Sequence, residues 1–154
     1  MAGRVTSKQL IDTMISHCER TGWFDRVNTH EPKNAPGRGL TAAIWVERID
    51  PVARVSGLAV TSVRFELFVR IYSNMLQEPA DAIDPNISQA SLDLMESISE
   101  GFRWEDEIFA VDLAGAYGQA LSGQSGYLQI DNKTFRVMTV RVPLILDDLW
   151  EQVA

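Results

Sequence analysis

The sequence has little thiol and imidazole chemistry, because Cys18 is its single cysteine and His17 and His30 are its two histidines. One thiol allows neither an intrachain disulfide nor a cysteine-based zinc site. His17 and Cys18 are neighbours, but successive residues of a helix point about 100° apart and cannot exchange a proton. We therefore expect no cysteine–histidine enzyme, and we expect Cys18 to pack in the core.

Basic residues are also scarce. Fourteen Lys and Arg against 21 Asp and Glu give a formal net charge of −7. Binding to a phosphate backbone requires a cluster of cations, and the sequence contains none. Its apolar runs fall far short of the ~20 residues that span a bilayer, and its first residues do not resemble a secretory signal. We expect no appreciable duplex DNA affinity, no membrane insertion and a reducing compartment.

A phosphate-binding loop is missing as well. The glycines of Gly118–Ser125 have suitable spacing, but Gln124 stands where the lysine belongs and a strand is expected to follow instead of a helix. Acidic pairs such as Asp147 and Asp148 favour a solvated surface, although a carboxylate metal site stays open as an alternative. The sequence thus predicts no catalytic residue, no cofactor and no metal.

What is present is an ordinary globular composition, with 45% hydrophobic and 23% charged residues. The length and the lack of a linker predict one domain over residues 1–154. Apolar periodicity, the capping-box spacing of Thr6 and Gln9, the stop residues Gly22 and Gly101 and turn residues predict the regular elements. These are helices over Ser7–Thr21 and Ile87–Glu100, an extended piece over Trp23–Val27, strands over Leu40–Ile49, Val60–Tyr72 and Glu107–Leu113, and a closing hairpin of Tyr127–Ile130 and Thr134–Leu146 that turns at Asp131–Lys133.

The connections carry proline, glycine and polar residues. Asp50 and Pro51 are expected to break a strand, and Gln77–Asn86 is expected to be a polar connection. Glu31–Gly39 and Ala114–Gly126 are predicted to be mobile loops, and residues 147–154 a short helical or frayed tail. Because helices and strands come in blocks, the fold class is predicted to be α+β, with a mainly antiparallel sheet of about four to six strands flanked by two main helices.

One face of the strand Val60–Tyr72 differs from an ordinary solvent face. Its apolar residues alternate with a second set that is rich in arginine and aromatic rings, a composition typical of protein interfaces. The preceding strand adds Trp45 and Glu47 to this side. The candidate subunit interface, called the mixed face below, therefore consists of Trp45, Glu47, Arg64, Glu66, Phe68, Arg70 and Tyr72. The alternative is that a helix of the same chain covers Phe68 and Tyr72 while the arginine heads reach solvent.

The order of elements resembles that of the tail terminator (tail-completion) proteins of long-tailed bacteriophages. The resemblance lies in the helix Ser7–Thr21, the arm Glu31–Gly39, the paired strands Leu40–Ile49 and Val60–Tyr72, the helix Ile87–Glu100 and the hairpin ending in Val-Pro-Leu-Ile-Leu-Asp-Asp-Leu-Trp150. It implies an α+β subunit of a homohexameric ring that caps the tail tube, stops its polymerisation and joins the head-completion proteins. It also implies no catalytic residue and no cofactor.

The resemblance implies a set of partners and a location. The partners are other copies of the chain, the tail-tube protein and a head-completion or connector protein, while DNA passes without specific binding. The two predicted loops are candidate partner-binding segments, represented by Lys33, Arg38, Tyr117 and Gln124. The chain is expected at the head–tail junction of the virion after synthesis in the host cytoplasm. Another neck or tail protein, a small cytoplasmic enzyme and a binding module remain the alternatives.

Overall fold

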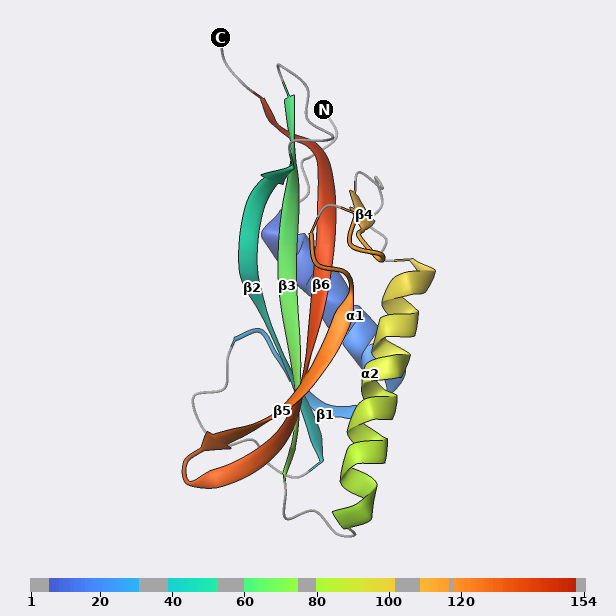
Figure 1. The fold of residues 1–154 in the computed structure, drawn as a ribbon, viewed down its shortest axis with the longest axis vertical. Coiled ribbons are helices and arrows are strands. Elements are labelled where there is room, and N and C mark those ends of the chain that lie inside the picture. The colour runs from blue at the N-terminus through green and yellow to red at the C-terminus, as the bar shows by residue number, and fades with distance from the viewer. Residues whose placement is uncertain are drawn as a thin grey trace.

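The computed structural model describes residues 6–30, 39–52, 60–74, 80–101, 109–116 and 118–151. Two α-helices and six strands lie in these ranges, and the α+β fold class is confirmed (Figure 1). A 3₁₀ turn at Ala80–Ala82 leads into the second helix. The elements are α1 (Ser7–Thr21), β1 (Phe24–Asn28), β2 (Leu40–Val52), β3 (Val60–Asn74), α2 (Ile83–Glu100), β4 (Phe109–Val111), β5 (Ser122–Ile130) and β6 (Lys133–Glu151).

The described strands form a single curled sheet. Its strand order is β1-β2-β3-β6-β4, and β5 also pairs with β6. The β1–β2 pairing is parallel and the other four pairings are antiparallel. The sheet is therefore mainly antiparallel, as the sequence predicts. With 19 residues, β6 is long enough to pair with β3 along one edge and with β5 and β4 along the other.

Both helices cover the same face of the sheet. In Figure 1, α1 crosses behind β3 and β6, α2 lies beside them, and β5 crosses in front. The alternating apolar residues of β3 point toward the helices, because their side chains share one face of a strand. They are buried together with one stripe of each helix, and the members from β3 are Val63, Phe65, Leu67, Val69 and Ile71. Burial of each such side chain contributes about 1.5–3 kcal/mol.

The first helix begins and ends where its sequence predicts. Thr6 and Gln9 form a reciprocal capping box, in which Thr6 Oγ1 accepts from the Gln9 amide at 3.2 Å and Gln9 Oε1 accepts from the Thr6 amide at 2.8 Å. Gly22 ends the helix with φ 73°, which only glycine adopts without strain. Cys18 is fully buried. Burial, and to a lesser extent the nearby charge of Glu19, raises the pKa of its thiol to about 12. This thiol is a core group and not a nucleophile.

His17 joins the two helices inside the core. Its Nδ1 lies 2.7 Å from Ser97 Oγ of α2, and the residue is 2% exposed. Burial, and to a lesser extent the charge of Arg20, lowers the imidazole pKa from 6.5 to about 4. Between pH 4 and pH 6.5, His17 therefore binds a proton in the unfolded chain but not in the folded chain.

This depressed pKa predicts a pH-dependent stability. The His17 contribution is fully present above pH 6.5 and is lost as the pH falls toward 4, with about 2 kcal/mol gone at pH 5. Urea unfolding of the wild type and of His17→Gln at pH 7.5, 6 and 5 measures it. The glutamine variant retains the carboxylate background and is expected to lose less stability on acidification. Parallel pH profiles for the two proteins would contradict the prediction.

The second helix starts earlier than its sequence suggests. It begins at Ile83 instead of Ile87, so the expectation of a connection over Gln77–Asn86 is wrong for its last residues. Pro85 is tolerated because the first-turn amides of a helix have no intrahelical acceptor. Ile83 is gained for the core, with 5% exposure. Gly101 ends the helix as predicted.

Three expectations about strands are also wrong. β2 continues through Asp50 and Pro51 to Val52, because β1 pairs only with residues 40–43 and the outer edge needs no donor at the proline. Ser122–Gly126, expected to be loop, belongs to β5 and pairs with β6. The expected tail at 147–154 is strand up to Glu151, because β6 keeps pairing with β3 there.

The remaining predictions about loops and chain ends mostly agree with the structure. The hairpin turns at Asp131 and Asn132, whose φ values of 51° and 63° are those of a two-residue type I′ turn. The strand expected over Glu107–Leu113 is seen as β4, Phe109–Val111, and then turns. Residues 31–38 and Tyr117 lie outside the described residues, so mobility stays a prediction for Glu31–Gly39 and for the part of Ala114–Gly126 that precedes β5.

Candidate subunit interface

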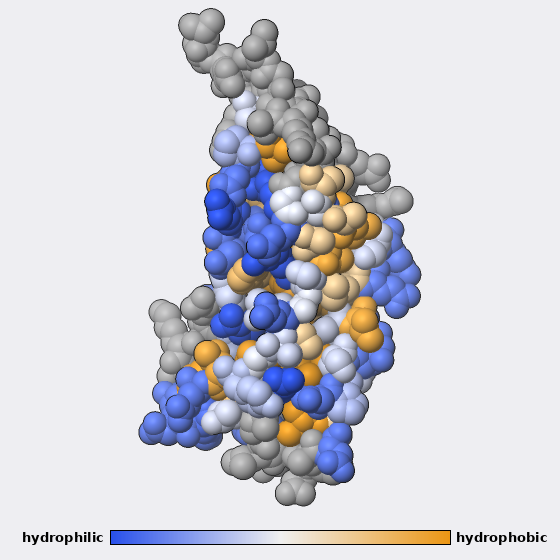
Figure 2. All heavy atoms as spheres, in the orientation of Figure 1, coloured by the Kyte–Doolittle hydropathy of each residue, from blue (hydrophilic) through white to orange (hydrophobic). Residues whose placement is uncertain are grey.

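The structure brings the predicted interface residues onto one face of the sheet, opposite the helices. The odd-numbered residues of β3 point into the helix-covered core, so the even-numbered ones from Arg64 to Tyr72 occupy the other side. Trp45 pairs directly with Phe68, and their rings meet edge to face at 6.1 Å. Hydrophilic residues gather over the part of this side formed by β2 and β3 (Figure 2).

The mixed face is only partly open. Glu47 is exposed, and Trp45, Phe68 and Arg70 are partly buried. The other three residues are covered by their own chain, with exposures of 5% for Arg64, 5% for Glu66 and 2% for Tyr72. The cover comes from β6 and from the segment around Gly118 and Gln119, and not from the helix that the sequence allows as an alternative.

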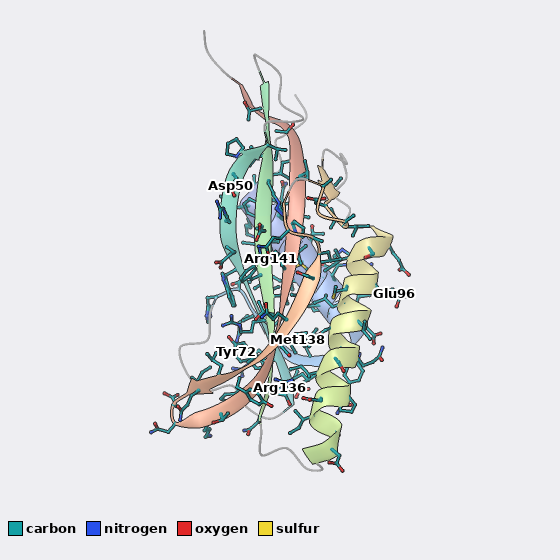
Figure 3. All side chains as sticks on the ribbon, in the orientation of Figure 1. Asp50, Tyr72, Glu96, Arg136, Met138 and Arg141 are labelled. Carbon is teal, nitrogen blue, oxygen red and sulfur yellow. The ribbon has the colours of Figure 1, made fainter. Side chains whose placement is uncertain are left out.

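Tyr72 lies in a small second core. Its ring meets that of Phe135 edge to face at 6.3 Å, and Ala43 and Val137 complete the buried cluster. Phe135 comes from β6, beside the hairpin turn, so the curl of β5 and β6 over this end of the sheet removes Tyr72 from the open surface (Figure 3). Tyr72 is therefore available to stabilise the face but not to contact a partner.

Arg64 and Glu66 form a buried charge network. Glu66 lies 3.4 Å from Arg64 and 3.2 Å from Arg141, so two guanidinium groups share one carboxylate. Arg64 also donates to the carbonyl oxygen of Gln119. A Cβ at Gly118 would overlap the Arg64 guanidinium, so a larger residue there would force the Arg64 head to shift from its place beside Glu66.

Arg70 is arranged differently. Its Nε donates to Thr139 Oγ1 at 2.9 Å, and its Cζ lies 5.2 Å from the centroid of the Trp45 ring. No carboxylate of the described residues lies within ion-pair distance of Arg70. The Arg70 side chain is therefore a partly buried cation held by an aromatic ring and a hydroxyl, and its charge is not compensated by any carboxylate of the described residues.

A pocket of about 340 Å³ opens between this face and β5. Its charged lining groups are Arg70 and Arg141, and its lining holds no carboxylate. Arg141 stands over the Phe68 ring at 5.1 Å. The full lining is Phe68, Arg70, Gln119, Ser122, Gln124, Ser125, Gly126, Tyr127, Leu128, Val137, Thr139 and Arg141. Cations, neutral hydrogen-bonding groups and aromatic surface together suit a carboxylate carried on an apolar body.

Sequence reasoning missed Arg141 and Thr139. Both lie on β6 opposite Phe68 and Arg70, and their place follows from the β3–β6 register, which the sequence does not show. The alternation of Val140, Val142 and Leu144 with polar residues was the available signal. Gln124, expected in a mobile loop, lines the pocket from β5. Lys33, Arg38 and Tyr117 lie outside the described residues.

Other kinds of site are not seen in the described part of the chain. There, no three side chains of His, Cys, Asp or Glu come together in a way that could hold a metal ion. No described helix is both long and apolar enough to cross a membrane.

Comparison with known proteins adds no relative. No protein-family model matches the chain, and no curated protein matches it in sequence. The function is therefore argued from the geometry and from the order of elements.

Proposed function

We propose that this chain is a structural subunit that assembles into a homo-oligomeric ring through the open part of the mixed face. The ring acts as a phage tail terminator: it caps the tail tube, stops its polymerisation and joins the head-completion protein. Its place is the head–tail junction, and it carries no catalytic residue.

The uncompensated charge of Arg70 is the observation that supports assembly most directly. A partly buried cation has lost part of its hydration and has no carboxylate of the described residues in return. A partner that supplies a carboxylate and covers Trp45 and Phe68 would gain both the ion pair and the aromatic area. The order of elements supports the choice of a tail terminator among ring-forming proteins.

The behaviour of the purified chain tests this function. We expect native mass spectrometry to give one closed oligomer, and negative-stain images to show rings that do not grow into tubes. Adding the chain to its cognate tail-tube protein, identified from the surrounding genes, should limit tube growth, with tube protein alone as the control. Tubes formed by this chain alone would identify a tail-tube subunit instead. A monomer that leaves tube growth unchanged would contradict the proposal.

A further inference from the structure

The mixed face cannot pair well with the same face of a second copy. Two-fold pairing about an axis at the pocket would set Arg70 and Arg141 of one copy near the same residues of the other. Of the carboxylates of this face, Glu66 is already shared between Arg64 and Arg141, and Glu47 accepts the indole N–H of Trp45. Like charges that face each other across an interface cost several kcal/mol. The partner surface must therefore be a different one, with acidic character.

Helix α2 has that character. The stretch Ile83–Glu100 contains four acidic residues and no lysine or arginine. Asp84 is paired with Arg136 at 2.9 Å, and Asp93 accepts from the indole Nε1 of Trp23 at 2.7 Å. Glu96 and Glu100 are exposed, and neither pairs with a described cation. The helix thus carries two exposed carboxylates that form no ion pair with any described cation of the same chain.

The position of these two carboxylates is locally unfavourable. Glu96 and Glu100 are four residues apart on one side of the helix, where like charges repel. They also lie near the helix C-terminus, whose partial negative charge favours cations. Leu92, one turn before Glu96, is 60% exposed and adds an apolar group beside the two carboxylates. Glu96 points away from the sheet in Figure 3, so the stripe is open to a partner.

We infer that the stripe Leu92–Glu96–Glu100 of one copy docks into the Arg70–Arg141 pocket of the next copy. Glu96 supplies the carboxylate that Arg70 lacks, and Leu92 covers the aromatic rings beside it. The two surfaces are different parts of the molecule, so the contact is head to tail and closes into a ring when the rotation allows. This inference rests on the proposed assembly and specifies its contact.

Two single variants test the contact. Glu96→Arg should weaken assembly by ~100-fold or more, because it places a cation against Arg70. Arg70→Glu should do the same from the other side. Glu19 is exposed on α1, and Glu19→Arg makes the same change in net charge as Glu96→Arg, so this control should assemble like the wild type. Analytical ultracentrifugation measures assembly, and circular dichroism checks folding.

Mixing the two variants gives the decisive result. Each variant retains one intact surface, so the wild-type Arg70 of Glu96→Arg should pair with the wild-type Glu96 of Arg70→Glu and give at least a dimer. The two substituted surfaces are also opposite in charge, so larger alternating assemblies, which neither variant forms alone, are a second sign of the same contact. No dimer in the mixture, or full assembly of Glu96→Arg alone, overturns this contact while wild-type rings still support the proposed function. A wild type that remains monomeric and leaves tube growth unchanged overturns both.

Discussion

The double substitution Arg70→Glu with Phe68→Ser is expected to abolish assembly and leave the subunit folded. Arg70 is the uncompensated cation of the pocket, and Phe68 holds Trp45 and Arg141 at its ring. Reversing the charge and removing the ring take away both gains that a partner would obtain. We expect the association constant to fall by at least ~100-fold.

The fold should survive because both side chains are only partly buried and neither belongs to the helix-covered core. Native mass spectrometry and tube capping measure the loss, and far-ultraviolet circular dichroism checks the fold. Leu113→Ser is a suitable control, since it also removes an exposed apolar side chain and Leu113 does not line the pocket. A double variant that folds and still caps tails would show that the mixed face is not the interface.

Loss of the Glu66 carboxylate should cause the largest loss of stability. Glu66→Ala leaves Arg64 buried without its counter-charge and frees Arg141 beside it. Removing one partner of a buried ion pair costs about 3 kcal/mol or more, because the remaining charge stays dehydrated. For a domain of this size, that corresponds to a fall in Tm of about 10 °C.

Glu47→Ala supplies the comparison for Glu66→Ala. Glu47 is exposed and accepts only the indole N–H of Trp45, at 3.0 Å, so its loss should cost less than about 1 kcal/mol. Scanning calorimetry of both variants gives the difference directly. Equal melting temperatures would show that the Arg64–Glu66–Arg141 network contributes nothing to stability.

The sequence alone determined the features that depend on near neighbours. The capping box of Thr6 and Gln9, the stop at Gly22 and the alternation in β3 were all predicted correctly, because each involves residues within one element. The turn at Asp131 and Asn132 belongs to the same group, although Lys133, also predicted in the turn, is the first residue of β6. The α+β class followed from the order of these elements.

Local signals misled where distant chain segments changed their meaning. Pro51 and Pro85 indicated breaks, but an unpaired strand edge and a helix first turn accept proline. Gly123 and Gly126 indicated a loop, but pairing with β6 holds them in a strand. In each case a hydrogen-bonding environment outside the local sequence decided the outcome.

Only the tertiary structure decided which residues of the mixed face are open. The pattern of β3 places Arg64, Glu66, Phe68, Arg70 and Tyr72 on one side, but it does not say what lies over them. The β3–β6 register brings Arg141 to Glu66, the curl of the hairpin brings Phe135 to Tyr72, and the loop at Gly118 covers Arg64. Arg70 keeps an uncompensated charge because its neighbours across the strands are a hydroxyl and an indole. Burial depends on contacts between segments far apart in the chain, and a periodic pattern in one strand does not contain them.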